Sequence, residues 1–273
     1  LQSGQPDNDI LLYWPIEDFW MQPGDQLLPQ LTVSNTRGWF DSQPIGKTAK
    51  ELWDKGYAFD YVSDAQLKTA KVVGGKIQTP GGNYKVIVVP ECKYIPLETL
   101  KQLLVLAENG ATVIFETEPT DVSGLSNYSD QHATLIKLLA EIQPSAFIHN
   151  VGIVHQGAGQ IIFGEKTVGL HFASAPLEPM VIDGLSFVRR SFDGGWNYFI
   201  ANRTETNFNG WISLSRPAKS LVILDPMTGS TGVAASRQSA VNQIEVHLQL
   251  VAGESVILRA FANKKVAGPA WNY

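Results

Sequence analysis

One stretch, residues 84–119, constrains the fold more than any other part of the chain. It reads YKVIVVPECKYIPLETLKQLLVLAENGATVIFETEP. Two β-branched runs of strand length, 86–89 and 112–115, flank a segment that begins at Pro96, carries leucines on one face and ends before Gly110. This pattern predicts a β-α-β unit. Both strands are apolar at consecutive positions, so we expect a parallel sheet with helices on each face.

Elements of the same kind surround this unit in the N-terminal half. We expect strands over 9–15 and 58–62, helices over 47–55 and 131–142, and a hairpin over 72–78 that turns at Gly74-Gly75. Residues 21–44 contain three prolines and two glycines and show no clear periodicity. They are therefore expected to form a long loop that carries Trp39 and Phe40.

The pattern changes beyond residue 145. Short alternating runs take over, at 146–155, 160–163, 186–190, 196–202, 211–214, 219–224, 243–250 and 255–261. Such runs without helices between them are typical of an antiparallel sandwich, not of more α/β sheet. The predicted fold is a flavodoxin-like or amidotransferase-like α/β domain over residues 1–172, followed by a small antiparallel β-sandwich over residues 173–273.

Composition excludes several classes of protein. The net charge is −5 and the pI is about 5.5, and no cluster of Lys and Arg is present, so a nucleic-acid or anionic-membrane partner is not expected. No apolar run approaches the roughly 20 residues that span a bilayer. Cys92 is the only cysteine, so no intrachain disulfide or cysteine-based metal site is possible. We predict neither a metal nor a cofactor.

Several long phrases carry a resemblance to a known family. They are DNDILLYWPIEDFW, GYAFDYVSDAQL, YKVIVVPECKYIPLETLKQLLVLAENGATVIFE, GLSFVRR, YFIAN, GWISL, LDPMTG and GESVILR. In this order they resemble the C-terminal half of glycoside hydrolase family 106, the α-L-rhamnosidases. The resemblance implies a catalytic (β/α)8 barrel, then a domain like a class I glutamine amidotransferase, then β-sandwich domains. It also implies a rhamnose-containing glycan as substrate, a periplasmic or secreted bacterial location and a possible homo-oligomer.

The catalytic barrel itself is not expected in this chain. A barrel needs roughly 250 residues and eight strand-helix repeats, whereas four or five such repeats precede the all-β region. The family's acid and base carboxylates belong to the barrel, so none can be assigned here. We therefore expect an accessory, non-catalytic portion of the enzyme, inactive alone, whose partner is an upstream barrel of the same polypeptide.

Polar side chains at the ends of the predicted strands are the candidates for a binding site. The carboxylates there are Glu17, Asp18, Asp64, Glu91, Glu116 and Glu118. An open α/β sheet forms its crevice at this edge. From this set and the neighbouring tryptophans, the residues expected to bind substrate are Trp14, Glu17, Asp18, Trp20, Glu91 and Glu116. Glu116 and Glu118 would share a face if their strand continued to them.

Two other functions stay open. A cysteine-dependent amidase would use Cys92, but this thiol lacks flanking glycines, and a structural cysteine is favoured. A carbohydrate-binding module could stack sugars on Trp196, Tyr198 and Trp211. However, Trp196, Tyr198 and Ile200 alternate, which favours a place in the sandwich core.

Two smaller patterns also give predictions. Arg189 and Arg190 are adjacent in a strand and point to opposite faces, so at most one of them would clamp a carboxylate. His149 and His155 would share a face of one strand, but the better interpretation is a structural role.

Overall fold

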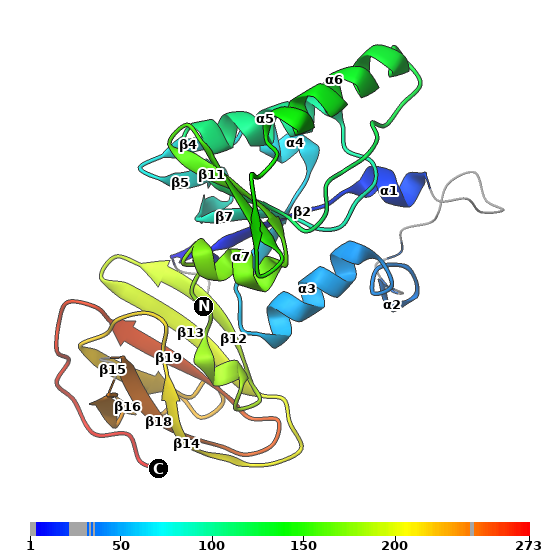
Figure 1. Ribbon diagram of the computed structural model, residues 1–273. Coiled ribbons are helices and arrows are strands. Elements are labelled where there is room, and N and C mark those ends of the chain that lie inside the picture. The colour runs from blue at the N-terminus through cyan, green and yellow to red at the C-terminus, as the bar shows by residue number, and fades with distance from the viewer. Residues whose placement is uncertain (1–3, 22–31, 33, 35, 241–242) are drawn as a thin grey trace. The chain divides into compact units, whose positions relative to one another are not determined.

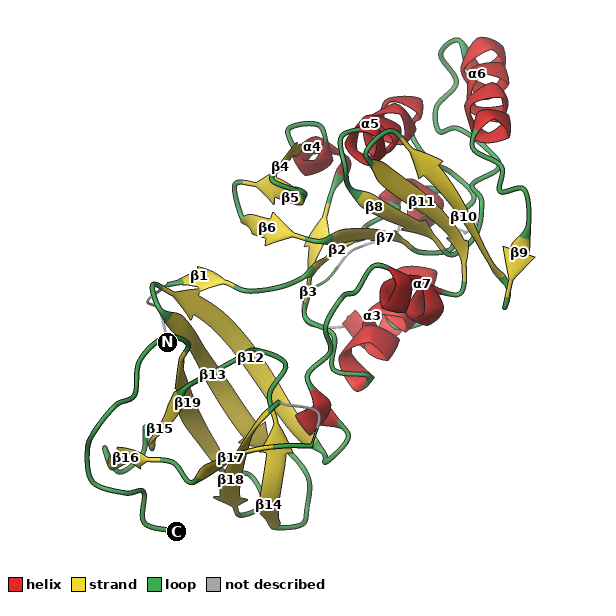
Figure 2. Cartoon of the chain, turned by 60° about the vertical axis from the view of Figure 1, so that its left-hand side comes forward, coloured by secondary structure: helices red, strands yellow, loops and turns green. Residues whose placement is uncertain are grey.

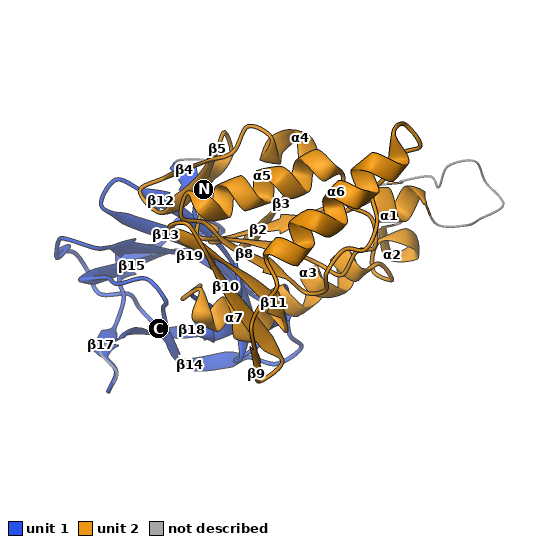
Figure 3. Ribbon diagram, turned by 45° about the horizontal axis from the view of Figure 1, so that its top comes forward, with its two compact units in different colours: residues 1–7, 53–58, 176–273 blue, residues 8–52, 59–175 orange. Residues whose placement is uncertain are grey.

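The computed structural model describes residues 4–21, 32, 34, 36–240 and 243–273. The chain divides into two compact units, and each unit is built from more than one chain segment (Figure 3). The α/β unit comprises residues 8–52 and 59–175. The β unit comprises residues 1–7, 53–58 and 176–273. The predicted domain limits, 1–172 and 173–273, assumed one crossing of the chain. The division of the chain into domains over residues 1–172 and 173–273 therefore remains a prediction.

A seven-stranded sheet forms the centre of the α/β unit (Figure 1). Its order is β3-β2-β7-β8-β11-β10-β9. The strands are β2 (Ile10–Tyr13), β3 (Phe59–Val62), β7 (Val86–Val89), β8 (Thr112–Phe115), β9 (Phe147–Ile148), β10 (Val151–Gln156) and β11 (Gly159–Gly164). The first five strands in this order are parallel, and β10 pairs antiparallel with both β11 and β9. Numbered along the chain, the parallel strands follow the order 2-1-3-4-5, which is the flavodoxin-like topology. The predicted fold class is confirmed.

Helices cover both faces of this sheet, as the apolar strands predict (Figure 2). One face carries α4 (Asp64–Leu67), α5 (Leu97–Glu108) and α6 (Tyr128–Glu141), and the other carries α3 (Pro44–Asp54) and α7 (Lys166–Phe172). Strand residues alternate between the two faces, and all of β2 and β7 is buried. Helix α5 begins after Pro96, and Gly110 follows its end with φ +114°, so the predicted β-α-β unit is confirmed.

The remaining elements of the α/β unit are short. Helices α1 (Ile16–Trp20) and α2 (Thr36–Trp39) follow β2, and β4 (Lys71–Val73), β5 (Lys76–Thr79) and β6 (Gly82–Tyr84) form a separate three-stranded sheet. The turn between β4 and β5 has positive φ at Gly74 and Gly75, as predicted. Half of the predicted loop over 21–44 lies outside the described residues, and the described half contains α2 and the first residue of α3.

The β unit is a sandwich of two antiparallel sheets. The larger sheet has the order β1-β12-β13-β19-β15-β16 and the smaller has β14-β18-β17. Their strands are β1 (Gln5–Pro6), β12 (Leu185–Phe192), β13 (Gly195–Asn202), β14 (Phe208–Ser213), β15 (Ser220–Leu224), β16 (Thr231–Val233), β17 (Ser236–Gln238), β18 (Ile244–Leu250) and β19 (Ser255–Phe261). Inward-facing residues of both sheets form one core that includes Tyr198 and Ile200, with Trp196 packed against it. The prediction for these three residues is confirmed.

A buried ion network holds the first segment of the β unit to the rest. The Glu178 carboxylate is buried, contacts Arg189 Nη1, and accepts hydrogen bonds from Tyr198 Oη at 3.1 Å, Ser215 N at 2.9 Å and Ser215 Oγ at 2.5 Å. Arg189 also donates from Nε to Asp7 Oδ2 at 2.5 Å, and β1 pairs with β12 beside it. Arg189 thus binds two carboxylates, those of Asp7 and Glu178.

The structure corrects the interpretation of residues 146–163. These runs extend the α/β sheet: β11 pairs in parallel with β8, and β10 pairs with β11. The run 146–155 is also not one strand, because His149 and Asn150 adopt positive φ in a turn between β9 and β10. His149 and His155 therefore do not share a strand face. Helix α7 was not predicted. No helix in the described residues is long and apolar enough to cross a membrane.

Candidate functional site

The candidate site lies in the α/β unit, where β2 and β7 are neighbours. Strand β3 lies on the far side of β2, and β8 lies on the far side of β7, so the chain leaves these two strands in opposite directions. This is the switch point of a doubly wound sheet, the usual place of a ligand crevice. The segments that meet there begin with Trp14 after β2 and Pro90 after β7. The predicted residues Trp14, Glu17, Asp18, Trp20 and Glu91 all lie on these segments.

Asp18 lies at the switch point and makes hydrogen bonds there with the backbone. Its carboxylate on α1 accepts hydrogen bonds from the backbone N–H groups of Lys93 at 2.7 Å and Tyr94 at 2.6 Å. Two adjacent N–H donors at the end of a strand form the kind of concavity that binds an anion. Burial raises the pKa of Asp18, and the two backbone donors oppose this effect. The protein thus fills this anion position with its own side chain.

Glu116, directly after β8, is held on several sides. Its carboxylate accepts from Thr48 Oγ1 at 2.9 and 3.0 Å and from Glu91 N at 3.2 Å, and it pairs with Lys166 Nζ at 2.9 Å. Lys166 also pairs with Glu51 at 2.6 Å. Burial would lower the pKa of Lys166, but the contacts with Glu51 and Glu116 outweigh burial and raise it. Glu116 therefore links α3, α7 and the segment after β7.

Two other carboxylates from the predicted set are also engaged. Asp64 Oδ1 accepts from Tyr13 Oη at 2.8 Å and from Thr99 Oγ1 at 2.5 Å. Glu118 Oε2 accepts from Gln143 Nε2 at 2.6 Å. Glu116 and Glu118 thus bind different parts of the unit, and β8 ends before both of them. The prediction that they share a strand face is not realised.

Glu17 and Glu91 differ from these carboxylates. Neither side chain has a hydrogen bond or an ion pair among the described residues. Glu17 is half-buried, and burial together with the negative charge of Asp64 raises its pKa. Glu91 is exposed. These are the carboxylates at this edge that stay available for an external group.

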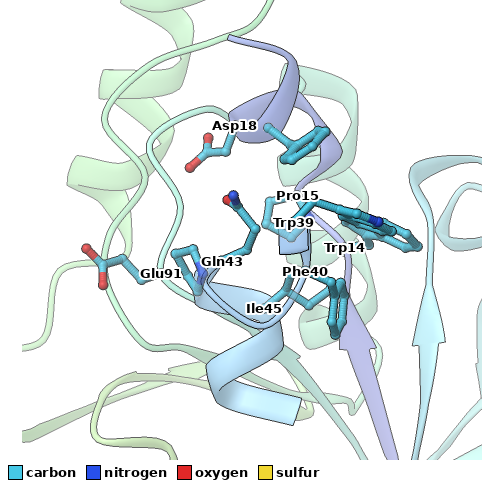
Figure 4. Close-up of a pocket in the computed structure, with 10 residues that line it drawn as sticks. Trp14, Pro15, Asp18, Trp39, Phe40, Gln43, Ile45 and Glu91 are labelled. Carbon is cyan, nitrogen blue, oxygen red and sulfur yellow. The ribbon is translucent and has the colours of Figure 1, made fainter. Parts of the chain in front are cut away.

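Aromatic side chains gather beside the same switch point (Figure 4). Trp14 stacks on Trp39 with ring centroids 6.2 Å apart, and Phe40 meets Trp14 edge-on at 6.0 Å and Tyr61 at 5.8 Å. These four residues are named here the aromatic cluster. Phe19 packs against Trp39 at 5.7 Å, whereas Trp20 points outward and is 45% exposed.

The aromatic cluster borders a cavity that also contains Asp18, Gln43 and Glu91 in its lining. Its volume is about 10 Å³, which is room for about one water molecule. In Figure 4 the Gln43 side chain points toward Asp18, and Glu91 points away from the rings. A sugar ring does not fit in this cavity, so any glycan contact at this edge must use the outer surface of the cluster.

Cys92 does not have the environment of a nucleophile. Its side chain is 3% exposed, and burial, followed by the negative charges of Asp18, Glu116 and Glu91, raises the pKa of the thiol. A reactive cysteine needs the opposite shift. No histidine hydrogen-bonds it among the described residues. In that part of the chain no three His, Cys, Asp or Glu side chains are grouped to hold a metal ion.

The segments that carry the predicted residues meet at one edge of the sheet, but the residues that contact them there were not predicted. The structure brings Trp14, Asp18 and Glu91 to one cavity and ties Glu116 to the backbone of Glu91. Glu17 and Trp20 lie on α1 but do not line that cavity. The residues that were missed are Thr48, Glu51, Tyr61 and Lys166. No local motif marks them, because their roles arise only when α3, β3 and α7 pack.

Comparison with known proteins identifies the family. The model of glycoside hydrolase family 106, described as alpha-L-rhamnosidase, matches residues 41–237, more than half of the chain. The chain belongs to this family. A curated relative, the putative beta-glucuronidase of Formosa agariphila, is 30% identical over 153 residues, which are 56% of this chain and 12% of that protein.

Solved structures of glycosidases share the fold. The rhamnosidase from Novosphingobium sp. PP1Y has a TM-score of 0.72 and 20% identity over 100% of this chain and 24% of its own. The beta-galactosidase from Bacillus circulans sp. alkalophilus has a TM-score of 0.57 and 12% identity over 95% of this chain and 42% of its own. The chain thus spans a fraction of the length of the proteins it matches. It corresponds to part of a rhamnosidase-like glycoside hydrolase.

Proposed function

We propose that this chain is a non-catalytic part of an α-L-rhamnosidase that acts on rhamnose-containing glycans. One observation carries the proposal. Four of the six carboxylates at the crevice of the sheet, Asp18, Asp64, Glu116 and Glu118, accept hydrogen bonds within the fold. The other two do not face one cavity, because Glu91 lines the cavity at the switch point and Glu17 does not. Hydrolysis of a glycoside needs two carboxyl groups on either side of the bond, and one of them must exchange a proton.

The architecture supports the same conclusion. A catalytic barrel has eight parallel strands closed on themselves, whereas the described residues contain an open sheet with five parallel strands. The chain also covers 24% of the solved rhamnosidase. In this proposal the catalytic barrel lies upstream in the same polypeptide, as the family resemblance implies, and is the principal partner of this region.

The proposed contact with that barrel is the edge of the α/β unit that carries the aromatic cluster. Trp14 is half-buried, Tyr61 is 43% exposed and Trp20 is 45% exposed, and the side chains of Glu17 and Glu91 stay available beside them. Exposed aromatic rings next to polar groups suit both a protein interface and the apolar face of a pyranose. In this proposal Trp14, Trp20, Glu17 and Glu91 wall the substrate cleft, and Asp18 and Glu116 position the segments that carry them.

Hydrolysis of an aryl α-L-rhamnoside tests this proposal. The chain is compared with the same chain extended through its natural upstream coding region. We expect activity in the extended protein alone, and in that protein we expect Trp20→Ala to raise KM more than it lowers kcat. Trp53→Ala is a matched control, because Trp53 is also 45% exposed but belongs to the β unit. Activity of the short chain would refute the proposal. Export from the cell and self-association stay predictions from the family.

A further inference from the structure

The β unit contains a surface groove that the role proposed above does not use. It has a volume of about 410 Å³, within the range of small-molecule sites. Strands β14 and β18, the turn after β18 and residues 271–273 form its walls. All of these residues belong to the β unit.

Three aromatic rings line this groove and are held by the fold. Phe208 and Trp271 pack against the sandwich core while remaining partly exposed. The Trp271 backbone N–H donates to the carbonyl of Val233 at 2.8 Å. Tyr273 Oη accepts from Ala235 N at 2.9 Å and donates to the His247 carbonyl at 3.0 Å, and its ring is 42% exposed. The structure therefore presents aromatic surface in a fixed place.

Amide side chains stand next to these rings without partners. Asn209 and Gln249 are directly opposite each other in the β14–β18 pair, on the outer face of the sheet, and both are exposed. Neither amide makes a hydrogen bond with another described residue, and the same holds for Asn272. An amide carries donors and an acceptor at adjacent positions. Such neutral groups can bind a vicinal pair of hydroxyls through both a donor and an acceptor.

Two further polar groups are oriented by the backbone. Asn207 Oδ1 accepts from Ala252 N at 3.1 Å, and Glu254 Oε2 accepts from Val251 N at 2.8 Å. Each contact fixes the side chain and leaves its second polar atom without a partner in the described part of the chain. Glu254 is the one charged side chain that lines the groove. The groove therefore combines fixed aromatic surface with several amides and a single charge.

We propose that this groove binds a neutral saccharide through a pyranose ring. The apolar face of the ring packs on Trp271 and Tyr273, and its hydroxyls bind the amides of Asn209 and Gln249. A charged ligand is disfavoured because nothing in the lining neutralises an anion and only one carboxylate would meet a cation. The site would hold a glycan chain near the enzyme independently of catalysis.

This site differs from the sugar platform that the sequence suggested. Tyr198 is fully buried, and Trp196 packs on the core and does not line the groove. Trp211 is 37% exposed, but Arg237 lies over its ring at 4.3 Å and His247 contacts it at 5.3 Å. The new groove lies beside Trp211 on the same sheet, and it was missed because residues 207–209 and 271–273 meet only in the folded unit.

Ligand-observed NMR and isothermal titration calorimetry on the intact chain test the proposal. The probes are methyl α-L-rhamnopyranoside, a galacto-oligosaccharide and a cello-oligosaccharide, each titrated to its solubility limit. We expect saturable binding of at least one probe. Asn209→Ala and Gln249→Ala should each weaken it about fivefold, the value of one hydrogen bond.

Asn263→Ala is the matched control, because Asn263 is also an exposed asparagine of the β unit and lies outside the groove. It should bind like the unchanged chain. Two outcomes would overturn the proposal: no saturable binding of any probe, or equal affinity in Asn209→Ala and in the control. Since these titrations need no turnover, their result is separate from the test of the rhamnosidase role.

Discussion

Removal of the Glu178 carboxylate should destabilise the β unit strongly. The residue is 1% exposed and its partner Arg189 is 2% exposed, so Glu178→Ala leaves a buried guanidinium with Asp7 as its remaining acidic partner. The hydroxyls of Tyr198 and Ser215 and the backbone N–H of Ser215 lose their acceptor at the same time. Breaking a buried ion pair from one side costs about 3 to 5 kcal/mol. Because Asp7 still compensates part of the charge, we expect about 3 kcal/mol.

Urea unfolding followed by circular dichroism measures this effect. A loss of about 3 kcal/mol should move the unfolding midpoint of the β unit down by roughly 1 to 3 M urea at the usual slopes. Arg237→Ala serves as the control, because its pair with Glu245 is on the surface, with the Arg237 side chain 55% exposed, and should change stability by less than about 1 kcal/mol. Equal midpoints for Glu178→Ala and the control would refute the reasoning, since the network would then contribute no more than a surface pair.

Three further predictions concern charge and packing. The positive charges of Arg189 and Arg216 outweigh the effect of burial, which by itself would raise the pKa of Asp7, and hold that pKa below its ordinary value of 3.8. This contribution to stability is therefore present above pH 3.8 and is lost as the pH falls through the lowered pKa. When the pH is lowered below 4, Asp7→Asn should lose less folding stability than the unchanged chain. The same loss of stability in both proteins would contradict this prediction. The pKa of Glu17 is raised by burial and by the charge of Asp64, so Glu17→Gln should raise Tm at pH 7 and lose this advantage below pH 4. A Cβ at Gly46 would lie 2.1 Å from the Phe40 carbonyl oxygen, so Gly46→Ala should cost about 1 to 3 kcal/mol and change the tryptophan fluorescence. A spectrum identical to that of the unchanged chain would show that α3 does not hold the aromatic cluster.

The core of the fold was predictable from sequence, and its edge was not. Consecutive apolar residues in 86–89 and 112–115 have one explanation, a strand covered on both faces. Strand β10 pairs antiparallel with its neighbours and is only partly buried, so its sequence pattern looks the same as that of a strand in a sandwich. Helix α7 escaped notice because it is seven residues long and has Gly169 in its interior. The helix packs closely on β8 at this residue, since a Cβ at Gly169 would lie 3.1 Å from the Ile114 side chain.

The candidate site was predictable at the level of segments. Strand ends are visible in the sequence, and the sheet topology sends them to one edge. Which carboxylates stay available is a different question, because it depends on partners far away in the chain. Thr48 is 68 residues from Glu116, and Lys93 is 75 residues from Asp18. Only packing of the helices decides that Asp18 and Glu116 are engaged while Glu17 and Glu91 are not.

The pairing of β1 with β12 sets an order of events during protein synthesis. Gln5 pairs with Ser191, so the first strand has no partner until 186 more residues have been translated, which takes roughly 10 to 40 seconds at usual ribosome speeds. Arg189, which binds Asp7, is translated 182 residues after it. The α/β unit can complete its sheet during this delay, because all of its strands precede residue 165. The β unit is therefore the later of the two units to form, and β1 stays unpaired throughout that time.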